Sequence, residues 1–86
     1  MTTSRFIARI DSGKANNLVY SLDGEEGLES VWKYEGAYFL TWEECSAGEQ
    51  YDESNYTRDE QHEFRTVEQM IAFLKDHGLK VEAFKP

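Results

Sequence analysis

The sequence predicts a single α+β domain spanning residues 1–86, in which an antiparallel sheet of about four to six strands packs against one helix near the C-terminus. Three observations predict this fold class. Several short runs alternate between apolar and polar side chains, which is typical of strands with one buried side. A later run repeats its apolar residues with the period of a helix. The 86 residues include two Trp, five Tyr and five Phe, enough for one aromatic core, and the chain is too short for a second.

The first expected strands lie near the N-terminus. In residues 5–10, apolar side chains at alternate positions fall on one side of an extended chain, and residues 17–22 alternate in the same way. The intervening residues 11–16 are rich in turn-forming types. We therefore expect the two runs to form an antiparallel hairpin.

A second hairpin is expected over residues 28–45, folded about Glu35 and Gly36. A two-residue turn at this point sets Trp32 opposite Phe39. Glu is not the preferred first residue of such a turn, so a longer loop with a shifted register stays open. Aromatic residues on both sides of this hairpin indicate a central position in the sheet.

One helix is expected over residues 66–77, where apolar side chains recur at i, i+3, i+4 and i+7. Thr66 followed by Gln69 fits a capping box, and Gly78 suits the left-handed backbone just after a helix. The alternation of residues 79–84 then predicts a short final strand.

Almost all of the net charge lies in residues 43–64. This segment holds eight acidic residues and one Arg, whereas the whole chain has a net charge of −8. Its last part, residues 56–64, fits either an exposed edge strand or an ordered loop. A patch of one sign attracts a partner of the opposite sign, but charged runs also serve as solvated loops. The residues alone leave both interpretations open.

Tyrosines among these acids favour a contact surface, because tyrosine is large, fairly rigid and able to hydrogen-bond at protein interfaces. We expect the acids to attract a partner, and the tyrosines and the arginine to anchor it. The candidate partner-binding residues are Glu49, Tyr51, Asp52, Glu53, Tyr56, Arg58, Asp59 and Glu60.

The sequence favours a binding protein over an enzyme. The chain has two histidines, His62 and His77, and a single cysteine, Cys45. It has no recognisable nucleophile–base motif, no spacing typical of metal ligands and no glycine-rich phosphate loop. We therefore expect no catalytic activity, no metal site and no cofactor.

The amino-acid composition also indicates the cellular compartment of the protein and the kind of partner that it binds. One cysteine permits no internal disulfide, which favours the cytoplasm, and no apolar run is long enough to cross a membrane. A net charge of −8 disfavours direct binding to nucleic acid or anionic lipid and favours a basic protein surface. An exposed strand edge leaves a monomer and a homodimer both open.

The acidic stretch from Trp42 to Phe64, in a chain of this size and fold class, resembles small inhibitor proteins of phages and mobile elements, including the anti-CRISPR proteins. The resemblance is one of general character, without a shared motif. It implies a stoichiometric inhibitor that blocks the nucleic-acid site of a basic effector complex. Immunity proteins that neutralise nuclease toxins share the same size and charge and stay an alternative. So does an accessory domain with a solubilising acidic loop.

Overall fold

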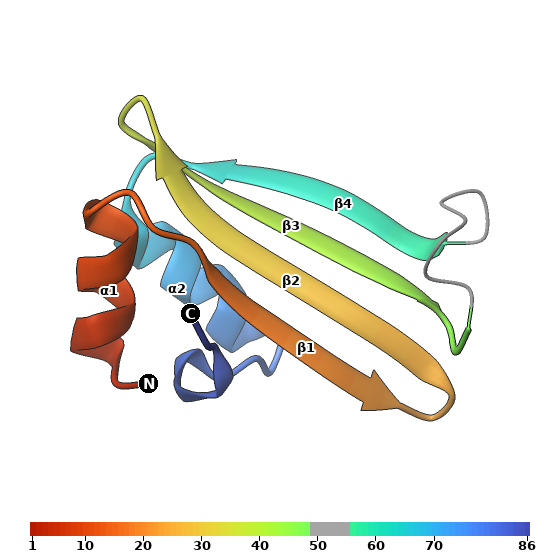
Figure 1. Cartoon of the computed structure of the whole chain (residues 1–86). Coiled ribbons are helices and arrows are strands. Elements are labelled where there is room, and N and C mark those ends of the chain that lie inside the picture. The colour runs from red at the N-terminus through yellow and green to blue at the C-terminus, as the bar shows by residue number, and fades with distance from the viewer. Residues whose placement is uncertain (49–55) are drawn as a thin grey trace.

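The computed structural model describes residues 1–48 and 56–86 of the chain. The elements in chain order are the helix α1 (Thr3–Asp11), the strands β1 (Asn16–Leu22), β2 (Glu25–Tyr34), β3 (Ala37–Ser46) and β4 (Tyr56–Phe64), the helix α2 (Val67–Asp76) and the short 3-10 helix η2 (Val81–Ala83). The four strands form one antiparallel sheet in the order β1-β2-β3-β4 (Figure 1), and residues of both helices join the core on one side of it. The predicted α+β fold class is confirmed.

Two tight turns set the register of the sheet. Residues 23–24 join β1 to β2, and Glu35 and Gly36 join β2 to β3; all four have positive φ. Positive φ at both central residues belongs to the type I′ turn, whose twist matches that of the flanking strands. The predicted two-residue turn is confirmed, and Trp32 lies opposite Phe39 as expected.

The N-terminal segment is a helix, so the predicted strand over residues 5–10 is wrong and β1 pairs with β2 instead. The Oγ1 atom of Thr2 caps α1 by accepting a hydrogen bond of 3.2 Å from a backbone N–H three residues later. Phe6 and Ile10 are both fully buried. Their spacing of four fits one face of a helix as well as one side of a strand. Ala8 distinguishes the two, because a strand would bury it with them and it is exposed.

The helix α2 begins where the capping box predicts. Thr66 Oγ1 accepts a hydrogen bond of 3.2 Å from the Gln69 N–H, and Gln69 Oε1 accepts one of 3.0 Å from the Arg65 N–H. Gly78 follows the helix with a φ of 72°, the left-handed backbone expected there. The predicted C-terminal helix is confirmed.

The predicted final strand over residues 79–84 is wrong. This segment forms η2, in which Val81 and Phe84 are buried at a spacing of three, the period of a 3-10 helix. A single β-bridge follows, in which Asn17 and Lys85 exchange two backbone hydrogen bonds of 2.7 Å. The C-terminal segment therefore covers part of the outer edge of β1.

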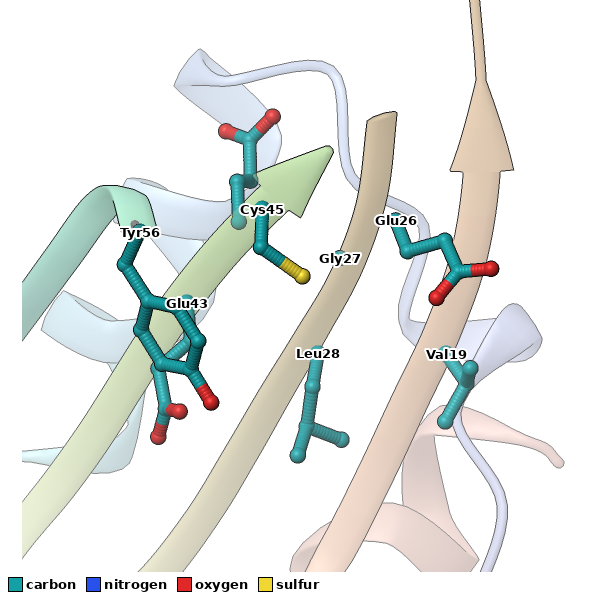
Figure 2. A pocket seen from close by; sticks show the side chains of 8 residues that line it. Val19, Glu26, Gly27, Leu28, Glu43, Cys45 and Tyr56 are labelled. Atoms are coloured by element: carbon teal, nitrogen blue, oxygen red, sulfur yellow. The ribbon is translucent and has the colours of Figure 1, made fainter. Parts of the chain in front are cut away.

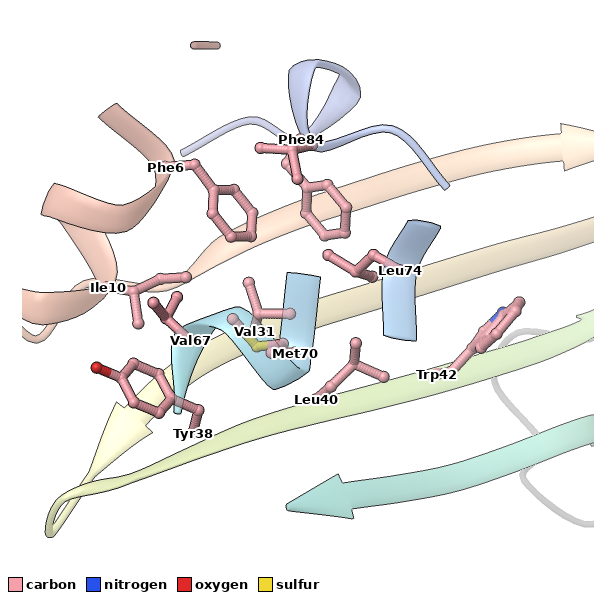
Figure 3. Close-up of a cluster of buried hydrophobic side chains, with 11 residues drawn as sticks. Phe6, Ile10, Val31, Tyr38, Leu40, Trp42, Val67, Met70, Leu74 and Phe84 are labelled. Carbon is pink, nitrogen blue, oxygen red and sulfur yellow. The ribbon is translucent and has the colours of Figure 1, made fainter. Parts of the chain in front are cut away.

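The core lies between the helices and the side of the sheet that faces them, here termed the helix side (Figure 3). The rings of Phe6 and Phe84 meet edge to face with centroids 5.3 Å apart. The buried cluster consists of Phe6, Ile10, Val31, Tyr38, Leu40, Trp42, Val67, Met70, Leu74, Val81 and Phe84. All of its strand residues lie on the helix side, and no described helix covers the opposite side of the sheet.

Candidate functional site

The side of the sheet opposite the helices, here termed the open face, is defined by the strand register. Side chains alternate between the two sides of a strand, and directly paired residues lie on the same side. The open face consists of Asn17, Val19 and Ser21 of β1, Glu26, Leu28, Ser30, Trp32 and Tyr34 of β2, Ala37, Phe39, Thr41, Glu43 and Cys45 of β3, and Tyr56, Asp59, Gln61 and Glu63 of β4.

Apolar side chains lie on the open face in two groups: an aromatic stripe of Trp32, Tyr34 and Phe39, and the pair Val19 and Leu28. The polar row Asn17, Ser30, Thr41 and Gln61 separates the two groups. Trp32 and Phe39 stack with ring centroids 5.8 Å apart and planes inclined by 17°. Val19 is 77% exposed and Tyr34 is 62% exposed. None of these side chains belongs to the buried cluster on the helix side, and Val19, Leu28 and Tyr34 are exposed. Large apolar side chains exposed together on one face are typical of a contact surface.

Carboxylates lie beside both apolar groups, and no basic residue lies among the strand residues of the open face. Glu26, Glu43, Asp59 and Glu63 belong to the open face, and none of its strand residues given above is Lys or Arg. Glu43 is paired directly with Asp59 across β3 and β4. Like charges directly opposite each other destabilise a sheet, so the fold does not gain from this arrangement. A basic partner would relieve the repulsion.

A hollow of about 340 Å³ opens on the same face (Figure 2). It is lined by the apolar side chains of Val19, Leu28 and Cys45, the ring of Tyr56 and the carboxylates of Glu26 and Glu43. Lys and Arg side chains combine an apolar stem with a charged head. A stem can therefore lie against the aliphatic lining while the head reaches either carboxylate.

The strand β4 divides the predicted partner-binding residues between the two sides of the sheet. Of the two predicted forms of this segment, the edge strand is confirmed. Tyr56 and Asp59 lie on the open face, the former through a register shift between β3 and β4, whereas Arg58 and Glu60 lie on the helix side. The other predicted residues, Glu49, Tyr51, Asp52 and Glu53, lie outside the described residues.

Arg58 contacts the side chains of Glu44, Glu60 and Trp42. Its Nε lies 2.7 Å from Glu44 Oε1, and its Nη1 lies 3.3 Å from Glu60 Oε2. Its guanidinium group also lies over the Trp42 ring, 3.9 Å from the ring centroid. These contacts hold β4 against β3 on the helix side. The role of Arg58 as an anchor for a partner stays a prediction.

Comparison with known proteins assigns no family. No family model, curated protein or solved structure matches the chain. Within residues 1–48 and 56–86, no three His, Cys, Asp or Glu side chains are grouped to hold a metal ion. In the same residues, no helix combines the length and apolar character needed to cross a membrane. The candidate site is thus defined by its own geometry: the two apolar groups, the carboxylates and the hollow of the open face.

Glu29 is a buried residue that sequence reasoning missed. Its side chain is fully buried on the helix side, and among the described residues neither carboxylate oxygen has a hydrogen-bond partner. Burial raises the pKa of Glu29 to about 7, although the positive charge of Arg58 acts in the opposite direction. The register places Glu29 between Leu18 and Trp42. Its position two residues before the buried Val31, where a strand expects an apolar residue, is the signal that could have found it.

Proposed function

We propose that this chain is a small binding protein that acts as a stoichiometric inhibitor of a basic, nucleic-acid-handling protein or complex. The observation that carries the proposal is the open face, where two groups of apolar side chains lie beside four carboxylates with no Lys or Arg among the strand residues of that face. Aromatic anchors inside a field of one sign suit a partner surface of the opposite sign. When this chain occupies the basic groove in which the partner binds phosphates, nucleic acid can no longer enter that groove.

Charge spacing indicates that the aromatic groups are needed as well as the carboxylates. Same-side residues along a strand are about 6.8 Å apart, whereas duplex DNA carries one charge per roughly 1.7 Å of axis. Asp59 and Glu63 are separated on the open face by Gln61 and so lie about twice that strand spacing apart. The carboxylates of the open face are therefore too widely spaced to imitate the charge density of DNA by themselves. Apolar contacts with the stacked Trp32 and Phe39 are expected to supply the rest of the affinity.

Affinity capture from a lysate of the host cell tests the proposal. The baits are the wild-type chain, the double variant Glu43→Lys/Asp59→Lys, and the control Asp76→Lys/Glu82→Lys. Both variants change the net charge equally, but the control acids are exposed and lie outside the sheet. Matching circular dichroism spectra must first show that all three baits are folded.

The expected result is that the wild type and the control both retain a basic nucleic-acid-binding protein, identified by mass spectrometry, and that the open-face variant loses it. The purified chain should then block nucleic-acid binding by that partner at a ratio of one to one. A nuclease toxin as the partner would make the inhibitor an immunity protein. Capture of the same partner by all three baits, or by none, would contradict the proposal.

A further inference from the structure

The outer edge of β4 is open to pairing. β4 is the last strand of the sheet, and over residues 57–64 no described residue forms a backbone ladder with its outer side. The opposite edge of the sheet differs, because Lys85 bridges Asn17 of β1 through two hydrogen bonds. Figure 1 shows β4 as the outermost arrow on the side away from β1. Among the described residues, part of the β1 edge is thus covered, whereas the edge of β4 over residues 57–64 carries no backbone pairing.

The side chains of β4 disfavour a second copy of the chain on this edge. Asp59, Gln61 and Glu63 are all exposed on the open face. Antiparallel pairing of two copies centred on Gln61 would set each Asp59 opposite Glu63 of the other copy. Like charges in directly opposite positions are destabilising, whereas opposite charges are favourable. The edge therefore suits a basic segment better than it suits itself.

The sheet register also specifies where the basic residues of an incoming strand should lie. Glu43 and Asp59 share one row across the sheet, so a residue added beside Asp59 has the carboxylate of Glu43 one strand further along the same row. The next row on this face ends in the uncharged Gln61. The row after that ends in Glu63, which is paired with Phe39 of the aromatic stripe. The two acidic rows are four residues apart along β4.

We propose that β4 binds an extended segment of a partner protein as a fifth strand, and that this segment carries Lys or Arg at positions i and i+4. One basic residue lies beside Asp59, with Glu43 one strand further along the row, and the other lies beside Glu63, with Phe39 one strand further along its row. Main-chain hydrogen bonds to the edge supply affinity, and the two basic side chains supply selectivity. This inference rests on the proposed function, since it states how the basic partner is held.

The acidic side chain on the helix side of β4 already has partners within the chain, so it is not expected to attract a basic partner. Glu60 lies 3.3 Å from Arg58 and 2.8 Å from His62, so its carboxylate is engaged within the chain. Arg65, just after β4, shares a shallow cleft with Glu63. Glu35 lines the same cleft, so one basic and two acidic side chains meet beside this end of β4.

Two synthetic peptides of equal composition test the inference. Both carry two Arg in a background of Thr and Val, one at i and i+4 and the other at i and i+3. The second peptide has the same charge, but a strand directs its two Arg to opposite sides. Titration into the full chain, followed by fluorescence anisotropy, should give roughly two- to fivefold tighter binding of the i, i+4 peptide.

Substitutions and hydrogen exchange locate the site. Asp59→Asn/Glu63→Gln should remove the preference for the i, i+4 peptide, while the control Glu68→Gln/Glu82→Gln, which alters exposed acids outside the sheet, should retain it. The i, i+4 peptide should also slow amide exchange in residues 57–64.

Equal binding of the two peptides overturns the inference, as does protection elsewhere in the chain or protection of β4 through self-association without peptide. If neither peptide binds but the open-face variant still loses its captured partner, the fifth-strand mode fails and the proposed function stands. If the i, i+4 peptide binds as expected but the chain captures no basic partner, the proposed function fails instead.

Discussion

Glu29 and Asn16 are the two fully buried polar or charged residues in the described part of the chain, and the fold treats them differently. Asn16 accepts a hydrogen bond of 2.8 Å from Arg9 Nε and donates one of 3.0 Å to the carbonyl of Phe6. Glu29 has no such partner among the described residues. A buried carboxyl without hydrogen bonds is costly when ionised, so the folded chain favours its neutral form.

Glu29 should make stability depend on pH. Its pKa in the folded chain is about 7 and its ordinary value is 4.5, so between these values the folded state binds more protons than the unfolded state. The free energy of unfolding should therefore fall by about 3 kcal/mol as the pH rises through this window. In the variant Glu29→Gln, this decrease in the free energy of unfolding should be absent. Urea unfolding of both proteins at pH 4, 6 and 8 measures it.

The exposed variant Glu82→Gln serves as the control for that experiment, because it removes an acid without touching the core. Its stability should follow the wild-type pH dependence. If the free energy of unfolding changed with pH in the same way in the wild type and in Glu29→Gln, the pKa of Glu29 would not be raised by burial, and the prediction would be wrong.

The composition of the acidic segment could be interpreted from sequence, but the side of the sheet on which each residue lies could not. Asp59 and Arg58 are neighbours, and the alternation of β4 puts them on opposite sides. The alternation of apolar and polar residues along the strands does not show which side of the sheet the helices cover, because Trp32 and Phe39 on the open face are as apolar as the residues on the helix side. Packing of distant helices decides it, and no local pattern encodes that choice.

Helices α1 and α2 differ in how well their sequences distinguish a helix from a strand. The apolar residues of α2, Val67, Met70, Ile71 and Leu74, fit only the helical period. In α1 the buried positions are Phe6 and Ile10, whose spacing satisfies both periods. The cap at Thr2 is the signal that favours the helix. A short element with two buried residues is therefore ambiguous where a longer one is not.

The cap of α2 gives a prediction at the scale of one element. Thr66→Ala removes the side-chain acceptor of the Gln69 N–H and should lower the free energy of unfolding by about 1 kcal/mol. Thr66→Ser keeps the acceptor and should cost much less. Denaturant titration followed by circular dichroism measures both. Equal losses in the two variants would indicate that the methyl group, and not the cap, supplies the stability.

The N-terminal and C-terminal segments of the chain pack against each other, although they are far apart in the sequence. Phe6 of α1 contacts Phe84, and the N-terminal amino group of Met1 lies 2.7 Å from the carbonyl oxygen of Glu82. Contacts between residues this distant in sequence leave no local pattern. For that reason the strand predictions for residues 5–10 and 79–84 both failed, while the hairpin of β2 and β3 was predicted correctly.

Phe84→Ala tests how much stability depends on this packing. The side chain is fully buried, so its loss should reduce the free energy of unfolding by about 3–5 kcal/mol. Phe84→Leu, which fills part of the space, should cost less. Val19→Ala on the open face should change stability little, because Val19 is 77% exposed. Chemical denaturation of the three variants measures this; a small loss in Phe84→Ala would show that the C-terminal segment is dispensable for the fold.

The two-residue turn at Glu35 and Gly36 also limits how this protein can evolve. Insertion of one residue in the strand after the turn would exchange the two sides of β3, moving Phe39 and Glu43 to the helix side. Substitutions can alter the open face one residue at a time, whereas a change in length here alters all of β3 at once. Related chains that diverge in partner choice should therefore conserve the length of this hairpin and vary in its outward residues.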